Sequence, residues 1–324
     1  MSRSLVVYCD SELPAPANEQ LARGLAGHEL RRAAKPLRSN LRPSGDDPAL
    51  QQAEVAFGQP APHVVLAAPR LRWVHLTSAG YTRYDNRAFR DAAATKGLVL
   101  SSSSSVYADP CAEHVLAMML AAARRVPEWL ADQATRRFAS AERRRESVLL
   151  RGQKVLLLGF GAIGRRLAEL LAPFEVEVRA LRRTPRGNEP VTVIGLAELD
   201  AALEWADHIV DVLPENAETI GLLDAYRIAL LRPSAVLYNV GRGTSLDHDA
   251  LAEALATRRL GAAFLDVTDP EPLPADHPLW SSPHCHLSPH SAGGRSTEHV
   301  ALVHHFLAEL DRYCRGEALR DRVI

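Results

Sequence analysis

A strand-length apolar run that leads directly into a glycine motif places the strongest constraint on how this chain folds. Residues 154–158 are Lys-Val-Leu-Leu-Leu, and a helix-like pattern follows the motif over residues 165–171. A G-x-G-x-x-G sequence alone is common in ordinary turns, but between a strand and a helix it is typical of a dinucleotide-binding βαβ unit. Its glycines allow a tight turn, and N–H groups at the helix start attract phosphates. We predict cofactor binding by Gly159, Phe160, Gly161, Ala162, Ile163 and Gly164.

The position of this motif near the middle of the chain constrains the domain organisation. The chain has 324 residues, so the sequence before the motif is itself of domain length, and we expect two domains. With 47% hydrophobic and 24% charged residues, the composition is that of a globular protein with material for two cores. A formal net charge of −1 gives no long-range attraction to nucleic acids or anionic membranes. We therefore predict no nucleic-acid partner and no membrane partner.

The cysteines and the apolar runs of the sequence indicate the cellular compartment in which the protein works. The four cysteines are scattered without a C-x-x-C pair, which fits a reducing cytoplasm better than a disulfide framework. The apolar run at the N-terminus is too short for a signal peptide. Residues 114–123 are apolar over about half a bilayer span, which indicates a buried helix. These features predict a cytoplasmic protein.

Short apolar runs alternate with helix-like stretches along most of the chain, which predicts parallel βαβ units. In the first half, strands are expected at residues 4–8, 54–57, 72–76 and 98–100, and helices at 17–26 and 87–94. After the glycine motif, strands are expected at 176–181, 208–213, 235–240, 262–266 and 284–287, and helices at 196–203, 224–231 and 249–257. We predict an α/β fold with two doubly wound parallel sheets.

Two segments between the halves each have two interpretations. Residues 101–105 are five consecutive serines, which form either a flexible loop or a crossover between domains. We favour the crossover, because a helical pattern follows at residues 112–125 and ends before Pro127. Residues 129–146 are rich in arginine. A solvated surface arm explains them better than a nucleic-acid patch, because interleaved aromatic residues and a basic net charge are lacking.

Three polar segments near expected strand ends in the second half carry candidate chemistry. They contain Arg242 in Asn-Val-Gly-Arg-Gly, Glu271 between two prolines, and His290 in Ser-Pro-His-Ser-Ala-Gly. Open α/β sheets bind ligands outside the carboxyl ends of their strands. Alone, each residue has an ordinary explanation: a surface charge, a loop carboxylate or a turn histidine. Together, a cation, a carboxylate and an imidazole suffice to move a proton and a hydride at a carbon that bears oxygen.

The triplet His284-Cys285-His286 invites a different interpretation, a metal site. On a strand, His284 and His286 share one face. Further ligands are not evident, and nearby His290 is already needed for proton transfer. We predict no metal.

With these motifs in register, the chain resembles the NAD(P)-dependent D-isomer-specific 2-hydroxyacid dehydrogenases. The resemblance covers most of the chain and is strongest over residues 111–293. Besides the motifs above, it rests on Ala-Glu-His at 112–114, where a long helix opens, and on Leu-Thr-Ser-Ala-Gly at 76–80. Pro-Leu-Trp at 278–280 is similar to the glyoxylate/hydroxypyruvate reductase branch.

The resemblance implies a domain organisation and an oligomeric state. It implies a Rossmann-type cofactor domain over residues 106–287 and a flavodoxin-like, discontinuous substrate domain formed by 1–105 and 288–324. It also implies a homodimer, because family members commonly pair through the long helix and the arm that follows it.

The resemblance assigns a chemical role to each polar segment. Arg242 would hold the substrate carboxylate and polarise the C2 carbonyl, which suits the planar, permanently charged guanidinium fork. His290 would be the general acid–base, because an imidazole exchanges protons near neutral pH. Glu271 would hydrogen-bond His290, orient the ring and favour its protonated form.

The resemblance also indicates residues that contact substrate and cofactor. A substrate-binding loop, whose backbone N–H groups hold the carboxylate, consists of Ser78, Ala79 and Gly80. Asp266 would lie near the nicotinamide ring. The further cofactor-binding residues are Pro214, Thr219, Val240, Gly241, Asp266 and His290.

Cofactor choice departs from the NAD pattern. In that pattern an acidic residue ends the second strand, roughly 20 residues beyond the glycine motif, and accepts the ribose 2′-OH. Here the expected strand leads into Arg182, Arg183 and Thr184. Arginines there bind a 2′-phosphate through charge-assisted hydrogen bonds, whereas an exposed basic turn is the ordinary alternative. We predict that NADP(H) is preferred, with NAD(H) as the second option.

Two further positions depart from the family pattern. The family more often has alanine or serine where this chain has Gly241, and an aromatic residue where it has Thr268.

The predicted function is NAD(P)H-dependent reduction of a small 2-keto acid, such as glyoxylate or hydroxypyruvate, to the D-2-hydroxy acid, with His290 as proton donor. The alternative is a nucleotide-sensing binding protein on the same scaffold, as in the C-terminal-binding-protein corepressors that resemble this family. The intact Arg242, Glu271 and His290 favour turnover without proving it, since such corepressors can keep them. A dehydrogenase for formate or phosphite is a third option, which no extended N-terminal region or substrate signature supports.

Overall fold

The computed structural model describes residues 3–40, 42–185 and 187–324, and these residues divide into two compact units. The first unit comprises residues 1–107 and 295–324, and the second comprises residues 108–294. The chain thus leaves the first unit and re-enters it at residue 295. Within the described ranges, we find no helix with the length and apolar character needed to cross a membrane.

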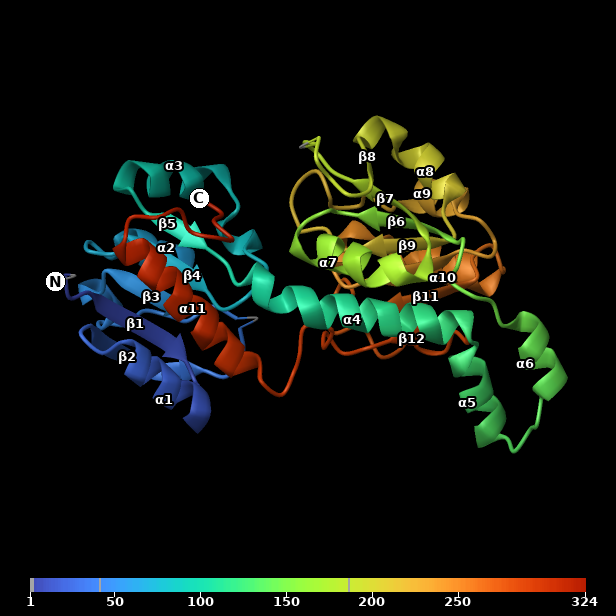
Figure 1. The fold of residues 1–324 in the computed structure, drawn as a ribbon, viewed down its shortest axis with the longest axis horizontal. Helices are drawn as coiled ribbons and strands as arrows, with labels where there is room; N and C mark the ends of the chain where they lie inside the picture. The colour runs from blue at the N-terminus through green and yellow to red at the C-terminus, as the bar shows by residue number, and fades with distance from the viewer. Residues whose placement is uncertain (1–2, 41, 186) are drawn as a thin grey trace. The chain divides into compact units, whose positions relative to one another are not determined.

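The first unit is built on a five-stranded parallel sheet with strand order β2-β1-β3-β4-β5 (Figure 1). This order is that of flavodoxin-like sheets. Helix α1 packs beside α11, and α2 packs beside α3. The strands are β1 (Val6–Ser11), β2 (Glu29–Leu37), β3 (Val55–Gly58), β4 (Trp73–Leu76) and β5 (Val99–Ser101). The helices are α1 (Ala15–Gly24), α2 (Pro62–Ala67), α3 (Arg87–Lys96) and α11 (Glu298–Cys314).

The second unit is built on a seven-stranded parallel sheet with order β12-β11-β10-β9-β6-β7-β8. The order reverses between β6 and β9, as in a Rossmann fold with an added edge strand, and ligands bind at such a reversal. The strands are β6 (Lys154–Leu158), β7 (Glu177–Leu181), β8 (Thr192–Ile194), β9 (His208–Asp211), β10 (Val236–Asn239), β11 (Ala262–Leu265) and β12 (Cys285–Leu287). The helices are α4 (Ser104–Ala123), α5 (Val126–Ala134), α6 (Ser140–Glu146), α7 (Ala162–Leu171), α8 (Leu199–Trp205), α9 (Ala225–Leu230) and α10 (His248–Ala256).

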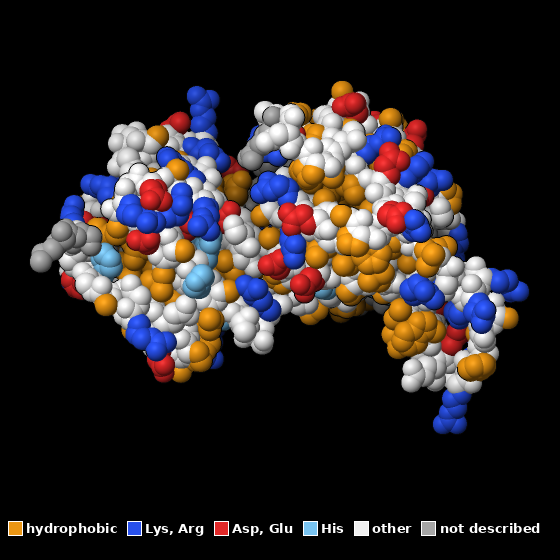
Figure 2. Space-filling view, in the orientation of Figure 1, with side chains coloured by type: hydrophobic (Ala, Val, Ile, Leu, Met, Phe, Trp, Pro, Cys, Tyr) orange, Lys and Arg blue, Asp and Glu red, His pale blue; other side chains and the backbone are white. Residues whose placement is uncertain are grey.

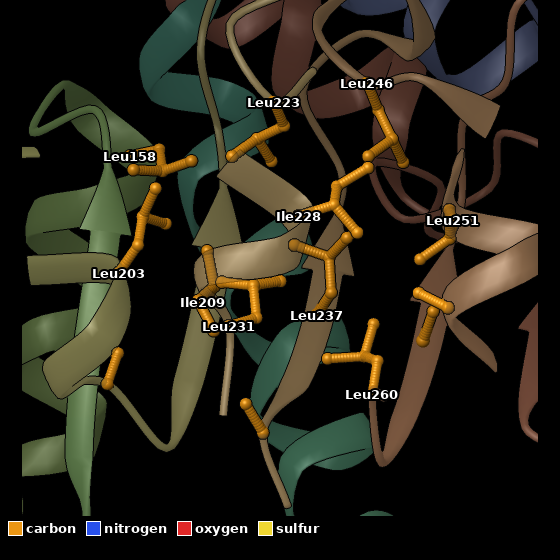
Figure 3. Packing of buried hydrophobic residues seen from close by; sticks show 14 of the residues in the cluster. Leu158, Leu203, Ile209, Leu223, Ile228, Leu231, Leu237, Leu246, Leu251 and Leu260 are labelled. Carbon is orange, nitrogen blue, oxygen red and sulfur yellow. The ribbon is translucent and has the colours of Figure 1, made fainter. Parts of the chain in front are cut away.

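Strand β6 shows why this sheet needs helices on both faces. Successive side chains of a strand point to opposite faces. Val155 and Leu157 belong to the apolar cluster that contains residues of α4 and α7. Leu156 and Leu158 belong to a second cluster, with residues of α8, α9 and α10, part of which Figure 3 shows. The continuous apolar run that we read as a strand is therefore buried on both faces, as is usual in parallel sheets.

Five elements were not predicted from the sequence: β2, β8, α2, α5 and α6. Helices α5 and α6 lie in the segment for which we predicted only a surface arm. Strand β2 contains two arginines, a lysine and a proline, and as the edge strand of its sheet it needs no apolar run. Strand β8 is likewise an edge strand, and it has three residues. Helix α2 has six residues, which is too short for a helical period to be recognised.

The serine run and the helix after it also differ from expectation. Ser101 ends β5 and Ser104 begins α4, so the serines are mostly part of regular elements. The prediction of a helix from residue 112 was wrong at its start, because α4 continues through Pro110. A proline is unfavourable in a helix interior, because it lacks the backbone N–H, so the sequence around Pro110 gives no sign of the first two turns of α4. The boundary between the two units falls inside α4, between residues 107 and 108.

Candidate functional site

The glycine motif lies between β6 and α7, as predicted, and its geometry fits a dinucleotide. A Cβ on Gly164 would lie 2.4 Å from the Gly159 carbonyl oxygen, so only glycine permits this approach. A Cβ on Gly161 would meet nothing within 4 Å, which leaves open space beside the turn. Gly161 is also the N-cap of α7, where no side chain caps the helix. The free N–H groups there suit a pyrophosphate.

Three neighbouring strands bring the predicted polar residues to one edge of the second sheet. Arg242 follows β10, Glu271 lies in the loop after β11, and His290 follows β12. These strands are adjacent and parallel. Because parallel strands have their carboxyl ends at the same edge, the three loops emerge together. This is the edge at which β6 ends in the glycine motif.

His290 and Glu271 form a direct pair. His290 Nδ1 lies 2.6 Å from Glu271 Oε1, although 18 residues separate them along the chain. The two side chains are 28% and 37% exposed, so the pair reaches the surface. A carboxylate at Nδ1 orients the ring and leaves Nε2 to exchange a proton with a bound molecule. An imidazole paired with a carboxylate in this way is chemically able to act as a general acid–base.

Asp266 holds the loop that carries His290. Its Oδ1 accepts hydrogen bonds from the Ser288 hydroxyl at 2.5 Å and from the Ser291 N–H at 2.8 Å. Its Oδ2 accepts one from the Ala292 N–H at 2.8 Å, and its carbonyl oxygen accepts one from the His290 N–H at 2.9 Å. We expected Asp266 to contact the nicotinamide ring, a role that remains a prediction. The structure adds a role in holding the His290 loop.

Arg242 lies between two glycines that press against neighbouring loops. A Cβ on Gly241 would lie 2.8 Å from the Leu213 carbonyl oxygen, and one on Gly243 would lie 2.0 Å from the Thr268 carbonyl carbon. These contacts pack the Arg242 loop between the loops that follow β9 and β11. They also explain why glycine stands at position 241. The Arg242 guanidinium donates to the Gly241 carbonyl at 2.6 Å and forms no ion pair with another described residue.

The predicted substrate loop follows β4 in the first unit. The Ser78 hydroxyl donates to the Gly80 carbonyl at 2.6 Å and accepts from Gln59 Nε2 at 2.9 Å. The Ser78 carbonyl accepts from the Ser103 N–H at 2.9 Å. Within the described ranges, the N–H groups of Ala79 and Gly80 have no hydrogen-bond partner. Two such donors in succession suit a carboxylate oxygen.

The arginines expected at the cofactor ribose follow β7 directly. Arg182 forms an ion pair with Glu189 at 3.4 Å, and both side chains are largely buried. Arg183 forms an ion pair with Glu218 at 3.0 Å, and both are exposed. Exposed ion pairs are weak, so Arg183 is the more available of the two cations. Thr184 is exposed next to them.

Pro214 and Thr219, expected at the cofactor, shape the turn that follows β9. The Thr219 hydroxyl donates to the Pro214 carbonyl at 2.7 Å and accepts from the Asn216 N–H at 2.9 Å. Val240, also expected there, continues the sheet after β10 by donating its N–H to the Asp211 carbonyl at 3.0 Å.

Comparison with known proteins decides the family. Residues 116–292 match the model of the D-isomer specific 2-hydroxyacid dehydrogenase NAD binding domain, which is more than half of the chain. The chain belongs to this family. It is therefore an NAD(P)-dependent oxidoreductase of 2-hydroxy acids, in agreement with the resemblance noted in the sequence.

Relatives and solved structures support this assignment. The glyoxylate/hydroxypyruvate reductase B of Pectobacterium atrosepticum is 34% identical over 263 residues, which cover 76% of this chain and 78% of that protein. A D-isomer specific 2-hydroxyacid dehydrogenase family protein from Aeromonas salmonicida is 27% identical, with a TM-score of 0.78 over 99% of both chains. A dehydrogenase of the family from Xanthobacter autotrophicus, in complex with NADPH and MES, is 25% identical, with a TM-score of 0.81 over 100% of this chain and 98% of that one.

Sequence reasoning missed the buried polar residues that support this dehydrogenase site. Asp211 and Ser245 lie under the Arg242 loop, and Asp10 and Gln59 lie under the Ser78 loop. An acidic residue directly after a buried apolar run, as in His-Ile-Val-Asp at 208–211, is a signal that could have found Asp211. Across the described ranges, we find no group of three or more His, Cys, Asp or Glu side chains suited to a metal ion.

Proposed function

We propose that this dehydrogenase reduces a small 2-keto acid to the D-2-hydroxy acid, with His290 as proton donor. The observation that carries the proposal is the 2.6 Å contact between His290 and Glu271, at the sheet edge where the Arg242 loop and the glycine motif also emerge. An acid–base pair, a cation and a dinucleotide site at one edge support turnover over the alternative of a nucleotide-sensing binding protein.

Each residue of the site has a task that follows from its chemistry. When bound, the dinucleotide supplies the hydride or accepts it. Arg242 binds the substrate carboxylate and draws electron density from the C2 carbonyl. His290 donates its Nε2 proton to the carbonyl oxygen, and Glu271 stabilises the charged imidazole before that transfer. In oxidation the same imidazole takes the proton from the hydroxyl group.

The substrate and cofactor loops complete the proposal. We assign Ser78, Ala79 and Gly80 to substrate binding, because the N–H groups of the last two are unpaired within the described ranges. The dinucleotide binds at Gly159, Phe160, Gly161, Ala162, Ile163 and Gly164, with Pro214, Thr219, Val240, Gly241, Asp266 and His290 around it. Glyoxylate and hydroxypyruvate are the first substrates to test, because the Pectobacterium relative is named for them.

We propose NADP(H) as the preferred cofactor, with NAD(H) as second. Arg182, Arg183 and Thr184 stand where an NAD-binding chain has an acidic residue. The Xanthobacter dehydrogenase is a complex with NADPH, which supports the same choice. Because Glu189 neutralises Arg182, we expect Arg183→Ala to weaken NADPH binding about tenfold through loss of a charge-assisted contact. The dissociation constant for NADH should stay nearly unchanged, and equal losses for both cofactors would contradict the assignment.

We further propose a homodimer in the cytoplasm. Helices α5 and α6 form an arm that projects from the second unit, and hydrophobic side chains are visible on it (Figures 1 and 2). The arm borders a hollow of about 1030 Å³. Its exposed large apolar side chains are Trp129, Leu130 and Phe138, with Val148 and Leu149 beside them. Apolar patches of this kind mark protein interfaces. Light scattering of the purified protein tests whether it forms the dimer.

The cytoplasmic location rests on the cysteines. The four cysteines form no disulfide, which fits the reducing cytoplasm.

The deciding experiment is a paired initial-rate assay. Purified protein is given NADPH or NADH with glyoxylate, hydroxypyruvate and bulkier 2-keto acids, and the loss of cofactor absorbance is followed. We expect turnover with NADPH to exceed turnover with NADH. Tight cofactor binding without turnover on any 2-keto acid would instead support the nucleotide-sensing protein.

A further inference from the structure

A carboxyl group shielded from water lies at the end of β9, in the middle of the second sheet. Asp211 is the last residue of this strand and is 0% exposed. Strand β9 is one of the two strands at the reversal of strand order. The proposed chemistry does not use Asp211. Burying a carboxyl group is costly unless hydrogen bonds compensate, so its partners indicate what it does.

The main partner of Asp211 connects it to the backbone of Arg242. The Ser245 hydroxyl lies 2.5 Å from Asp211 Oδ2 and 2.7 Å from the Arg242 carbonyl oxygen. Asn239 Nδ2 donates to the same carbonyl at 3.0 Å, and Asn239 Oδ1 accepts from the Gly241 N–H at 2.9 Å. Asp211, Asn239 and Ser245 are all at most 2% exposed. The turn that presents Arg242 is thus held from below by a buried polar group of three side chains.

A second contact couples Asp211 to the same turn from the other side. Asp211 Oδ1 accepts a hydrogen bond from the Leu213 N–H at 2.9 Å, which closes a tight turn after β9. This turn presses the Leu213 backbone against Gly241, where a Cβ would lie 2.9 Å from the Leu213 nitrogen. The carboxyl group of Asp211 therefore fixes both neighbours of the Arg242 backbone: the Ser245 hydroxyl and the Leu213 peptide.

We propose that Asp211 and Ser245 are positioning residues for Arg242, which set the place of its guanidinium without touching substrate or cofactor. The proposal rests on the proposed function, because it assumes that Arg242 binds the substrate carboxylate. A long side chain can bind a carboxylate with two parallel hydrogen bonds only if its own backbone is held in place. Loss of Asp211 or of Ser245 should therefore weaken substrate binding more than it weakens cofactor binding.

Ser245→Ala is the main test, because it removes one hydroxyl and little volume. We expect the KM for glyoxylate, measured with NADPH, to rise roughly 5- to 20-fold, which lies within the range of coupling found inside one hydrogen-bonded network. The Kd for NADPH should change less than twofold. Asp211→Ala should show the same pattern. Asp211→Asn should remain close to wild type, because its amide still hydrogen-bonds Ser245.

The matched control is Tyr238→Phe, on the same strand that leads to Arg242. It also deletes one buried hydroxyl, which contacts His208 at 3.1 Å and belongs to a different cluster. We expect both hydroxyl deletions to lower the melting temperature, and only Ser245→Ala to raise the KM. If Tyr238→Phe raises the KM equally, the effect of Ser245→Ala is general destabilisation, and the proposal is overturned.

A double-mutant cycle separates this inference from the proposed function. The Kd of oxamate, an analogue of a 2-keto acid, is measured on the NADPH-loaded protein, which needs no turnover. Arg242→Ala should weaken oxamate binding, and Ser245→Ala should add nothing further in that background. If Ser245→Ala weakens oxamate binding equally with and without Arg242, its effect does not pass through Arg242. The inference then fails, while the proposed function stands. If Arg242→Ala leaves oxamate binding intact, the proposed function and the inference fail together.

Discussion

Each of the two sheets of this dehydrogenase buries one acidic residue in the same way, but the two residues hold different loops in place. In the first unit, Asp10 of β1 is 0% exposed and accepts hydrogen bonds from the Ser44 hydroxyl at 2.7 Å and the Gln59 N–H at 2.9 Å. In the second, Asp211 of β9 accepts from a serine hydroxyl and the Leu213 N–H. Each strand lies where its sheet reverses order.

The difference lies in what the two acidic residues hold in place. Gln59, which Asp10 fixes through its backbone, reaches the Ser78 hydroxyl, and that loop offers backbone N–H groups. Asp211 holds the turn of Arg242, and the neighbouring strands carry Glu271 and His290. The first unit therefore presents uncharged donors, and the second presents groups that change or carry charge. The proposed function assigns proton transfer to the second unit alone.

The largest effect that tests this division is expected at His290. His290→Ala removes the proton donor and should lower kcat by about a hundredfold to ten-thousandfold. The Kd for NADPH should stay nearly constant. Ser78→Ala, in the loop of the first unit, should leave kcat within about threefold, because it removes no proton-transferring group. Equal losses of kcat in the two variants would contradict the assignment of proton transfer to the second unit alone.

The next effect concerns the packing of loops in the second unit. Gly243→Ala places a Cβ into the Thr268 carbonyl and should cost about 1–3 kcal/mol of unfolding free energy, together with activity. Gly45→Ala in the first unit is the control, since its Cβ would meet nothing within 4 Å. Urea unfolding of both variants measures the difference. A stable, fully active Gly243→Ala would contradict the packing of the Arg242 loop against the Thr268 loop.

The two buried acids should give matching pH dependences of stability. Burial raises the pKa of both Asp10 and Asp211 to about 6, although the serine hydroxyls oppose the shift. The unfolded chain then loses these protons first, so stability falls as the pH rises through the window from about 4 to 6. Asparagine cannot ionise. As the pH rises from 4.5 to 7.5, the free energy of unfolding of Asp10→Asn and that of Asp211→Asn should therefore each gain about 2 kcal/mol relative to that of the wild type.

Denaturant titrations at the two pH values measure this gain, with Asp276→Asn at the surface as the control. Similar gains in both units would show that the two carboxyl groups are equivalent in the fold and differ only in what they hold. A gain in one unit alone would show that the buried groups are not equivalent.

The smallest expected effect lies in the first unit. Gln59→Ala removes the donor to Ser78 and Thr77 and should raise the KM for glyoxylate about threefold to tenfold, with a smaller change in kcat. Gln52→Ala is the control, because its amide contacts Arg31 in a hydrogen bond on the surface of the same unit. An unchanged KM in Gln59→Ala would mean that the loop needs no support from Asp10 and Gln59.

Local patterns were sufficient to predict most of the fold. The run at 154–158, the glycine motif and the amphipathic stretch after it predicted a strand, a turn and a helix, each of which depends on near neighbours in sequence. The edge strands β2 and β8 escaped prediction, because pairing with a neighbouring strand stabilises them more than their own residues do.

The sequence by itself determined the family, the two parallel sheets and the identity of Arg242, Glu271 and His290 as candidates, because motif spacing and apolar periodicity are local properties. The contact between His290 and Glu271, which the family resemblance implied, is present in the tertiary structure. Only the tertiary structure decided that Asp211 reaches the Arg242 turn through Ser245. The physical reason is the parallel sheet: it brings the ends of β9 to β12 to one edge, although long crossovers separate them along the chain. Contacts of that kind depend on strand order, which no short stretch of sequence contains.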